Sequence, residues 1–346
     1  MDSRGASAAV IEDPRGQCEQ LAERTGIALP HITAAREHTR ERVAELRDAL
    51  DHETLAGGMS ICVFGSWARD ELTPHSDDDW AVLAAQPFAA EDQDVATAMD
   101  LAEEHLGAGD RAPGSQSVFG VPFDLPGLVD NVGLNADTNT NLTRRMLLLL
   151  ESRELAGTVH DEAWRAVLER YLNYGVKDFR PPRFLLNDLT RYWRTICVDF
   201  EGKHSDTRGD DPKWVSRNAK LRTSRKLLFA GGLVPILLCH LHDRDAMPEF
   251  LATWLKAPPL DRLAAAFLWA EAESEGARAL SAYDRWLAIQ FNAAARTELK
   301  ALRHDTRRES PLFEEIMEIG RQFERAVLAL LFNTRLAALS QQYVVF

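Results

Sequence analysis

One segment, residues 59–84, constrains the fold more than any other part of the chain. It begins with the apolar run MSICVF, reaches Gly65 and Ser66, passes through the polar stretch RDELTPHSDDD and enters a second apolar run, WAVLA. Short apolar runs that contain β-branched residues and are bounded by turn residues are typical of buried strands. The segment therefore predicts two buried strands joined by a polar connection.

The polar connection carries three consecutive aspartates at the start of the second strand. Side chains alternate between the faces of a strand, so Asp77 and Asp79 are expected on one face. Asp78 is then expected on the other face, either solvated or bound to a basic residue. Two carboxylates on one face repel each other unless a cation lies between them, and Mg²⁺ or Mn²⁺ fits such a pair. The alternative interpretation is a solvated acidic turn.

Gly65 and Ser66 complete a candidate site for a metal–triphosphate. Gly65 lets a phosphate approach the backbone closely because it has no side chain. Ser66 offers a hydroxyl and an amide near the start of a short helix or turn, which is a favourable place for a phosphate. With Asp77 and Asp79 as metal ligands, these residues are suited to hold a triphosphate with its α-phosphorus open to in-line attack.

The string from Val63 to Trp80 resembles the signature of the nucleotidyltransferase superfamily that includes DNA polymerase β. In that signature a hydrophobic residue, Gly, and Gly or Ser precede a spacer and then Asp-x-Asp. Within the superfamily, RDELTPHSDDD is most similar to the transferase lobe of the bacterial PII-protein uridylyltransferases and their relatives. The resemblance is clear over 63–83, extends weakly through 138–157 and does not cover the C-terminal half.

The resemblance implies roles for individual residues of the string. Asp77 and Asp79 match the metal ligands, and Gly65 and Ser66 match the residues that contact the triphosphate. Arg69, in the same string, is a further candidate for nucleotide binding.

A third carboxylate on a later strand is usual in active members of the superfamily, where it binds the catalytic metal and helps to deprotonate the acceptor. Asp124, which ends the run SVFGVPFD, is the best placed candidate for this third metal ligand. Asp130 and Asp137 are less suitable because they are expected in loop or cap positions. The alternative interpretation of Asp124 is a turn residue that ends a strand before Leu-Pro-Gly.

The pattern along the chain predicts an α+β protein. A flexible N-terminal tail is expected over 1–30, and a small mixed-sheet nucleotidyltransferase lobe over 31–137. From about Thr138 the periodicity is helical, with a first helix expected to run through Leu155. A larger all-helical lobe is therefore expected over 138–346.

The helical part contains a strongly basic stretch. Between Pro212 and Ala230 there are six Lys and Arg residues and no acidic residue, whereas the whole chain has a net charge of -13. Some of these side chains are expected to bind the triphosphate or an anionic acceptor, since Arg binds phosphate bidentately. The candidates are Arg217 and Arg225, with Arg191 and Arg194 from the preceding helix. The alternative is a solvated face, or ion pairs with the acidic excess.

Composition excludes several classes of protein. A net charge of -13 argues against a protein that coats nucleic acid generally. The longest apolar runs are far shorter than the roughly 20 residues of a membrane span. The four cysteines form no C-x-x-C pair, which predicts reduced thiols and a cytoplasmic protein.

The sequence therefore predicts a metal-dependent nucleotidyltransferase that moves a nucleoside monophosphate from an NTP to a hydroxyl and releases pyrophosphate. The acceptor is not identified, and a protein side chain is the one that the closest resemblance implies. Two enzyme alternatives are synthesis of a nucleotide second messenger and modification of a small molecule such as an antibiotic. A third alternative is a non-catalytic nucleotide-binding or antitoxin module with the same fold.

Overall fold

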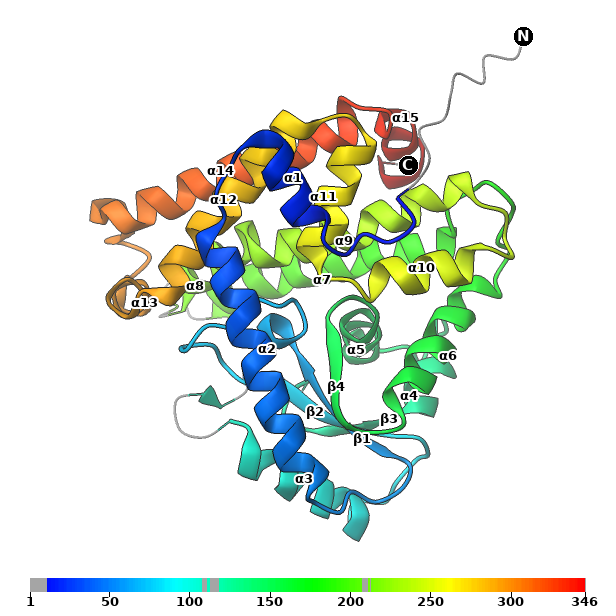
Figure 1. The fold of residues 1–346 in the computed structure, drawn as a ribbon. Helices are drawn as coiled ribbons and strands as arrows, with labels where there is room; N and C mark the ends of the chain where they lie inside the picture. Colours follow the sequence, from blue (N-terminus) through cyan, green and yellow to red (C-terminus); the bar gives the residue numbers. More distant parts are fainter. Residues whose placement is uncertain (1–10, 108–110, 113–117, 207–210, 212, 346) are drawn as a thin grey trace.

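The computed structural model describes residues 11–345 except 108–110, 113–117, 207–210 and 212. In this part of the chain a four-stranded mixed sheet packs among many helices (Figure 1). The predicted α+β class with a small mixed sheet is therefore confirmed.

The sheet has the strand order β3-β2-β1-β4. Its strands are β1 (Met59–Phe64), β2 (Trp80–Ala84), β3 (Pro122–Asp124) and β4 (Ser152–Gly157). β1 is antiparallel to both of its neighbours, whereas β2 and β3 are parallel. Because the end of β1 pairs with the start of β2, the polar connection between them lies at one end of the sheet.

Helices make up most of the remaining chain. They are α1 (Gln17–Thr25), α2 (Pro30–Asp51), α3 (Gln93–His105), α4 (Leu125–Val129), α5 (Asn139–Leu150), α6 (His160–Leu172), α7 (Arg183–Asp206), α8 (Trp214–Arg222), α9 (Ser224–Leu238), α10 (Met247–Leu255), α11 (Pro259–Trp269), α12 (Glu273–Phe291), α13 (Ala293–Ala301), α14 (Pro311–Phe332) and α15 (Ala337–Ser340). Several begin at a capping side chain, among them Asp92, Thr138, Asn292 and Ser310, which accept a hydrogen bond from the backbone of the first turn.

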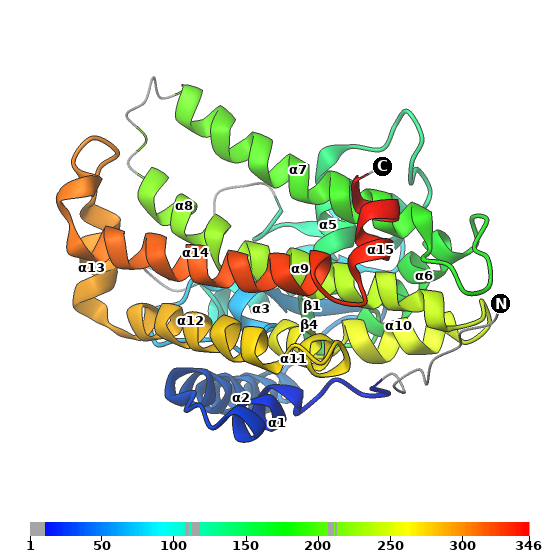
Figure 2. The same cartoon turned by 90° about the horizontal axis from the view of Figure 1, so that it is seen from above.

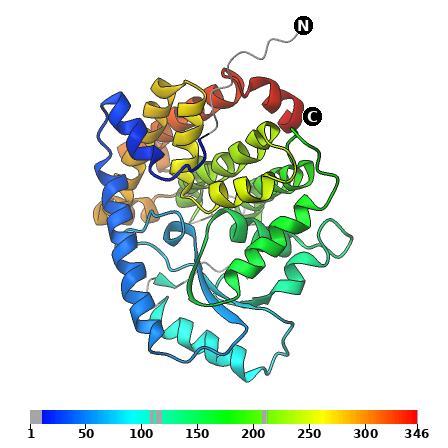
Figure 3. The ribbon, with the colours of Figure 1, turned by 45° about the vertical axis from the view of Figure 1, so that its right-hand side comes forward.

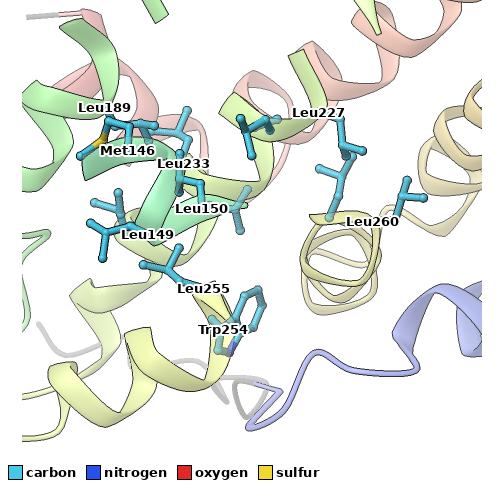
Figure 4. Packing of buried hydrophobic residues seen from close by; sticks show 14 of the residues in the cluster. Met146, Leu149, Leu150, Leu189, Leu227, Leu233, Trp254, Leu255 and Leu260 are labelled. Carbon is cyan, nitrogen blue, oxygen red and sulfur yellow. The ribbon is translucent and has the colours of Figure 1, made fainter. Parts of the chain in front are cut away.

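Both faces of β1 are buried, and alternate residues enter two different clusters. Ile61 and Val63 pack with residues of α2 and α3 on one face. Cys62 and Phe64 belong to a larger cluster on the other face, which continues through α5 into the helices that follow. Figure 4 shows part of this larger cluster, with side chains from α5, α7, α9, α10 and α11. One core therefore connects the sheet with the helices, and the predicted separation into two lobes is not confirmed.

Long helices surround the sheet and one another. α2 lies along one side of the molecule and contacts α12 as well as β4 (Figure 3). Seen from above, α12 lies between α14 and the pair α1 and α2, and it contacts all three (Figure 2). Helices from the two ends of the chain thus pack against different sides of α12.

One local prediction was wrong because strand pairing overrides helical periodicity. The helix expected through Leu155 ends at Leu150, and residues 152–157 form β4, which pairs with β1. The sheet therefore extends past the expected boundary at residue 137. The expected tail over 1–30 contains α1, in which Leu21 is completely buried. Residues 1–10 of that tail lie outside the described part.

One apolar segment of the described chain, Trp214–Leu241, has the length and composition of a membrane-spanning helix. However, 72 % of its most apolar window is buried inside the protein, as in the core of a soluble protein. The backbone of Thr223, at φ -118° and ψ -95°, separates α8 from α9 within this segment.

Candidate functional site

A cavity of about 830 Å³ lies where the connection between β1 and β2 faces helices α5, α7, α8, α9, α12 and α13. Pockets that bind small molecules and cofactors usually have volumes of about 300–1,000 Å³. This cavity is therefore large enough for a nucleotide. Residues of the segment 59–84, with which the sequence analysis began, form part of its lining.

Four of the predicted residues come together in this lining: Gly65, Ser66, Asp77 and Asp79. We call them the sheet wall. Val63 pairs with Trp80, and the Phe64 backbone N–H donates to the Asp79 carbonyl over 2.8 Å. The end of β1 is thereby held against the residue that precedes β2.

Glycine is required at position 65 for two reasons. Its φ of +64° lies in the left-handed region, which side chains disfavour. A Cβ atom on residue 65 would also lie 3.0 Å from the Asp79 carboxylate oxygen Oδ2. Gly65 thus leaves room for the carboxylate that is expected to bind metal.

Asp78 points away from the cavity, as strand alternation predicts. Its carboxylate is almost completely buried and accepts hydrogen bonds from Trp67 Nε1 at 3.0 Å, the Gly107 N–H at 3.0 Å and Arg111 Nη2 at 2.8 Å. Of the two expected environments for Asp78, the structure has the pairing with a basic residue. This contact anchors the middle of the aspartate run while its two neighbours face the cavity.

Asp124 is not part of the site, so its predicted role as the third metal ligand is wrong. It pairs with Ala84, at the opposite end of β2 from Asp79, because β3 runs parallel to β2. Five residues of strand correspond to about 16 Å. The Asp124 carboxylate instead accepts from the Gly127 N–H at 2.7 Å and caps α4. The cavity lining before β3 is provided by Val118 and Phe119, which carry no carboxylate.

The described residues contain no group of three or more His, Cys, Asp or Glu side chains arranged to hold a metal ion. The pair Asp77 and Asp79 nevertheless has the donor chemistry that Mg²⁺ uses when phosphate oxygens and water complete its coordination. The Asp77 side chain is 37 % exposed, so it can reach such a ligand.

Arg69 lines the cavity, but its guanidinium is already paired. Nε donates to Glu71 Oε2 over 2.7 Å, and Nη1 donates to Glu151 at the start of β4. Burial alone would lower the pKa of Arg69, but these two carboxylates raise it well above its usual value, so Arg69 stays charged. The Arg69 guanidinium is therefore held by two carboxylates, and the structure does not present it as a free phosphate ligand.

Of the four arginines predicted from the basic helices, three line the cavity and one does not. Arg191, Arg194 and Arg225 are part of the lining. Arg191 also forms long ion pairs, 3.3 Å to Asp137 and 3.4 Å to Asp188. Arg217 lies outside the lining and donates to the buried Asp211 over 2.6 Å, so it has the structural role of an ion-pair partner.

The cavity also contains cations that the sequence analysis did not select. Lys220, on the basic stretch, has its Nζ 3.6 Å from Asp77 Oδ2. Its position in that stretch was the only local signal for it. Arg296 is on α13, more than 200 residues from the aspartates, and no local pattern predicts it. Lys203 of α7 lies 2.7 Å from Asp199 in the same lining.

The charges of the cavity are separated between its two sides. Among the described residues, the helices contribute six cations and one carboxylate, which we call the helical wall: Arg191, Arg194, Lys203, Lys220, Arg225, Arg296 and Asp199. The chain as a whole has a net charge of -13, so this surface is unusual for the protein. An anionic ligand with a bound metal cation is complementary in charge to both walls.

Neither the known protein-family models nor the curated proteins contain a match to this chain.

Proposed function

We propose that the cavity binds a nucleoside triphosphate with Mg²⁺ or Mn²⁺ and that the protein is a nucleotidyltransferase. An acceptor hydroxyl oxygen forms a bond to the α-phosphorus, and the bond from that phosphorus to the β-phosphate bridging oxygen breaks. Pyrophosphate leaves, and the hydroxyl proton passes to solvent. The product is an ester of the nucleoside monophosphate with the acceptor.

The observation that carries this proposal is the opposition of the two walls across one cavity. Asp77 and Asp79 lie beside a glycine turn, and Arg194 and Arg225 line the helical wall. Among the described residues Arg191 forms ion pairs with carboxylates, whereas Arg194 and Arg225 form none. A metal ion suits the first wall and phosphate groups suit the second. A nucleoside triphosphate with its metal supplies both in one ligand.

Asp77 and Asp79 are the residues that would hold the metal, which supplies neutralisation of charge on the phosphate oxygens when bound. Gly65 allows the phosphates close to the backbone, and Ser66 offers a hydroxyl donor. The arginines orient the charged groups through bidentate hydrogen bonds. The resemblance to the PII-protein uridylyltransferases favours a protein side chain as the acceptor.

The proposal is tested by incubating the protein with Mg²⁺ or Mn²⁺, each α-labelled NTP and cell lysate. We expect a labelled acceptor together with pyrophosphate release. A labelled protein band, a labelled small molecule and a new soluble nucleotide would distinguish the three acceptor classes. The four cysteines are free, which suits a reducing compartment, so a cytoplasmic lysate is the appropriate source.

The Asp77→Asn/Asp79→Asn double variant is the decisive comparison. Loss of several kcal/mol of metal-dependent stabilisation lowers the rate by about 1,000-fold. Asp124→Asn makes the same chemical change in the same sheet, away from the cavity, and is expected to transfer label like the parent. Equal transfer by the parent and the double variant would rule out the metal-ligand assignment.

A second candidate function is nucleotide binding without transfer, as in a binding or antitoxin module. The position of Asp124 favours it, because no third carboxylate joins Asp77 and Asp79 from β3. Metal-dependent NTP binding with neither label transfer nor pyrophosphate release, in every lysate fraction, would support this function over the first.

A further inference from the structure

The part of the cavity next to Asp77 contains two cationic side chains from separate helices. Lys220 comes from the last turn of α8 and lies 3.6 Å from the Asp77 carboxylate. Arg296 comes from the first turns of α13. Burial lowers the pKa of its guanidinium, and Asp77 is close enough to offset part of that effect.

Arg296 is oriented by a neutral group. Its Nη1 donates to Gln290 Oε1, near the end of α12, over 3.1 Å. Among the described residues no carboxylate forms an ion pair with Arg296, which is half-buried and which Asp77 influences only from a longer distance. A guanidinium in this environment has lost water without gaining an ion pair, which costs free energy unless an anion is bound in the functional state.

The amide of Gln290 gives an independent indication. Its Nε2 is buried and has no hydrogen-bond partner in the described part of the chain. Buried polar atoms are nearly always paired, so an orphaned donor that lines a cavity indicates a missing acceptor. Gln290 and Arg296 both line the same cavity.

The contact between Lys220 and Asp77 is of the kind that exchanges easily. The Lys220 side chain is 49 % exposed and the Asp77 side chain 37 %. Exposed ion pairs contribute only about 0–1 kcal/mol. A divalent cation that binds Asp77 would displace the Lys220 ammonium, which could then pair with a neighbouring anion.

We propose that Arg296, Gln290 and Lys220 form the subsite for the terminal phosphates of the nucleoside triphosphate. This inference rests on the proposed nucleotide site and assigns the β- and γ-phosphates to the Asp77 side of the cavity. Arg296 and Gln290 donate to phosphate oxygens that a nucleoside monophosphate lacks. The subsite therefore selects a triphosphate over a monophosphate.

The test is a set of calorimetric titrations of NTP and NMP, in Mg²⁺, into the full chain and its variants. Arg296→Met removes the charged donor, and we expect NTP affinity to fall by about 10- to 100-fold. NMP affinity should change less than twofold. Gln290→Leu and Lys220→Met should weaken NTP binding in the same selective way, with smaller effects.

Arg285→Met is the matched control, because Arg285 lies on α12 but is paired with Glu315 at 3.2 Å, away from the cavity lining. It should bind both nucleotides like the parent. Arg296→Lys keeps the charge and is expected to recover part of the NTP affinity. It replaces Arg296→Met as the test variant if the methionine variant does not fold.

The outcomes separate this inference from the proposed function. A parent that binds no nucleotide contradicts the proposed site as a whole. A parent that binds NTP, with Arg296→Met weakening NTP and NMP equally or neither of them, overturns only the terminal-phosphate assignment. Inorganic tripolyphosphate provides a further probe, because it should compete with NTP in the parent and fail to do so in Arg296→Met.

Discussion

The two walls of the cavity are built in different ways. The sheet wall comes from one short stretch, residues 65–79, whose positions are set by strand pairing and by the buried Asp78. The helical wall comes from α7, α8, α9 and α13, which are distant in sequence. A local motif can therefore specify the acidic side of this cavity, whereas only the packing of several helices produces its basic side.

Ion pairs near the two walls also differ in how deeply they are buried. Beside the sheet wall, the Arg69 side chain is 12 % exposed. It pairs with the side chains of Glu71 and Glu151, which are 2 % and 8 % exposed. On the helical wall, the pair between Lys203 and Asp199 is 28 % and 41 % exposed. The buried ion pairs of Arg69 beside the sheet wall are therefore expected to be more rigid than the exposed Lys203–Asp199 pair on the helical wall.

Arg69→Met gives the largest expected effect on this comparison. Removing one partner of a buried ion pair leaves uncompensated charge and usually costs about 3–5 kcal/mol. We expect a decrease of that size in the free energy of unfolding, measured by urea denaturation. Lys203→Met, the counterpart on the helical wall, should cost less than about 1 kcal/mol because its pair is exposed. Equal costs would contradict the proposed difference in rigidity.

Gly65→Ala separates backbone strain from the room that Asp79 needs. Left-handed backbone costs a residue with a side chain about 1–2 kcal/mol. Gly175→Ala is the matched control, because Gly175 also has a left-handed backbone, with a φ of +60°. A Cβ atom added at Gly175 would meet nothing within 4 Å, whereas one added at Gly65 would lie 3.0 Å from Asp79. Both variants should lose similar stability, but only Gly65→Ala should weaken Mn²⁺ binding, measured by electron paramagnetic resonance. Unchanged Mn²⁺ affinity would argue against Asp79 as a ligand.

Sequence patterns predicted the α+β class, both central strands and the convergence of Gly65, Ser66, Asp77 and Asp79. These features depend on nearest neighbours, since strand alternation and turn geometry act over a few residues. The same reasoning failed for β4, whose sequence SRELAG continues a helical pattern and becomes a strand only by pairing with β1. It also failed for Asp124, because a strand's direction in the sheet cannot be derived from its own residues.

The cationic side chains of the cavity could also be predicted only in part from local sequence. The basic stretch indicated Arg225, and it contains Lys220, but it also indicated Arg217, which pairs with Asp211 outside the cavity. Charge along a helix does not reveal which face meets the cavity. Arg296 had no local signal, because its position depends on the packing of α13 against α8.

The pH dependence of stability tests the protonation of Glu71, the buried carboxylate that pairs with Arg69. Burial raises the pKa of Glu71, and Arg69 offsets only part of that effect. The folded protein therefore holds the Glu71 proton to higher pH than the unfolded chain, so this group favours folding at low pH. Its contribution is lost as pH rises above 4.5 through the raised pKa. Glu71→Gln does not titrate, so the difference in unfolding free energy between parent and variant should change across this range. A constant difference would contradict the raised pKa.

Asp124 provides the smallest expected effect and the sharpest control for the sheet wall. Asparagine caps a helix about as well as aspartate, whereas alanine costs about 1 kcal/mol. Asp124→Asn should therefore match the parent in unfolding free energy and in metal-dependent nucleotide binding, and Asp124→Ala should lose stability alone. The reason is geometric, because the carboxylate bonds to the Gly127 N–H at the far end of β2 from Asp79. If a folded Asp124→Asn protein lost metal-dependent binding or transfer, the acidic centre would have to include β3, and the sheet wall would no longer be a purely local structure.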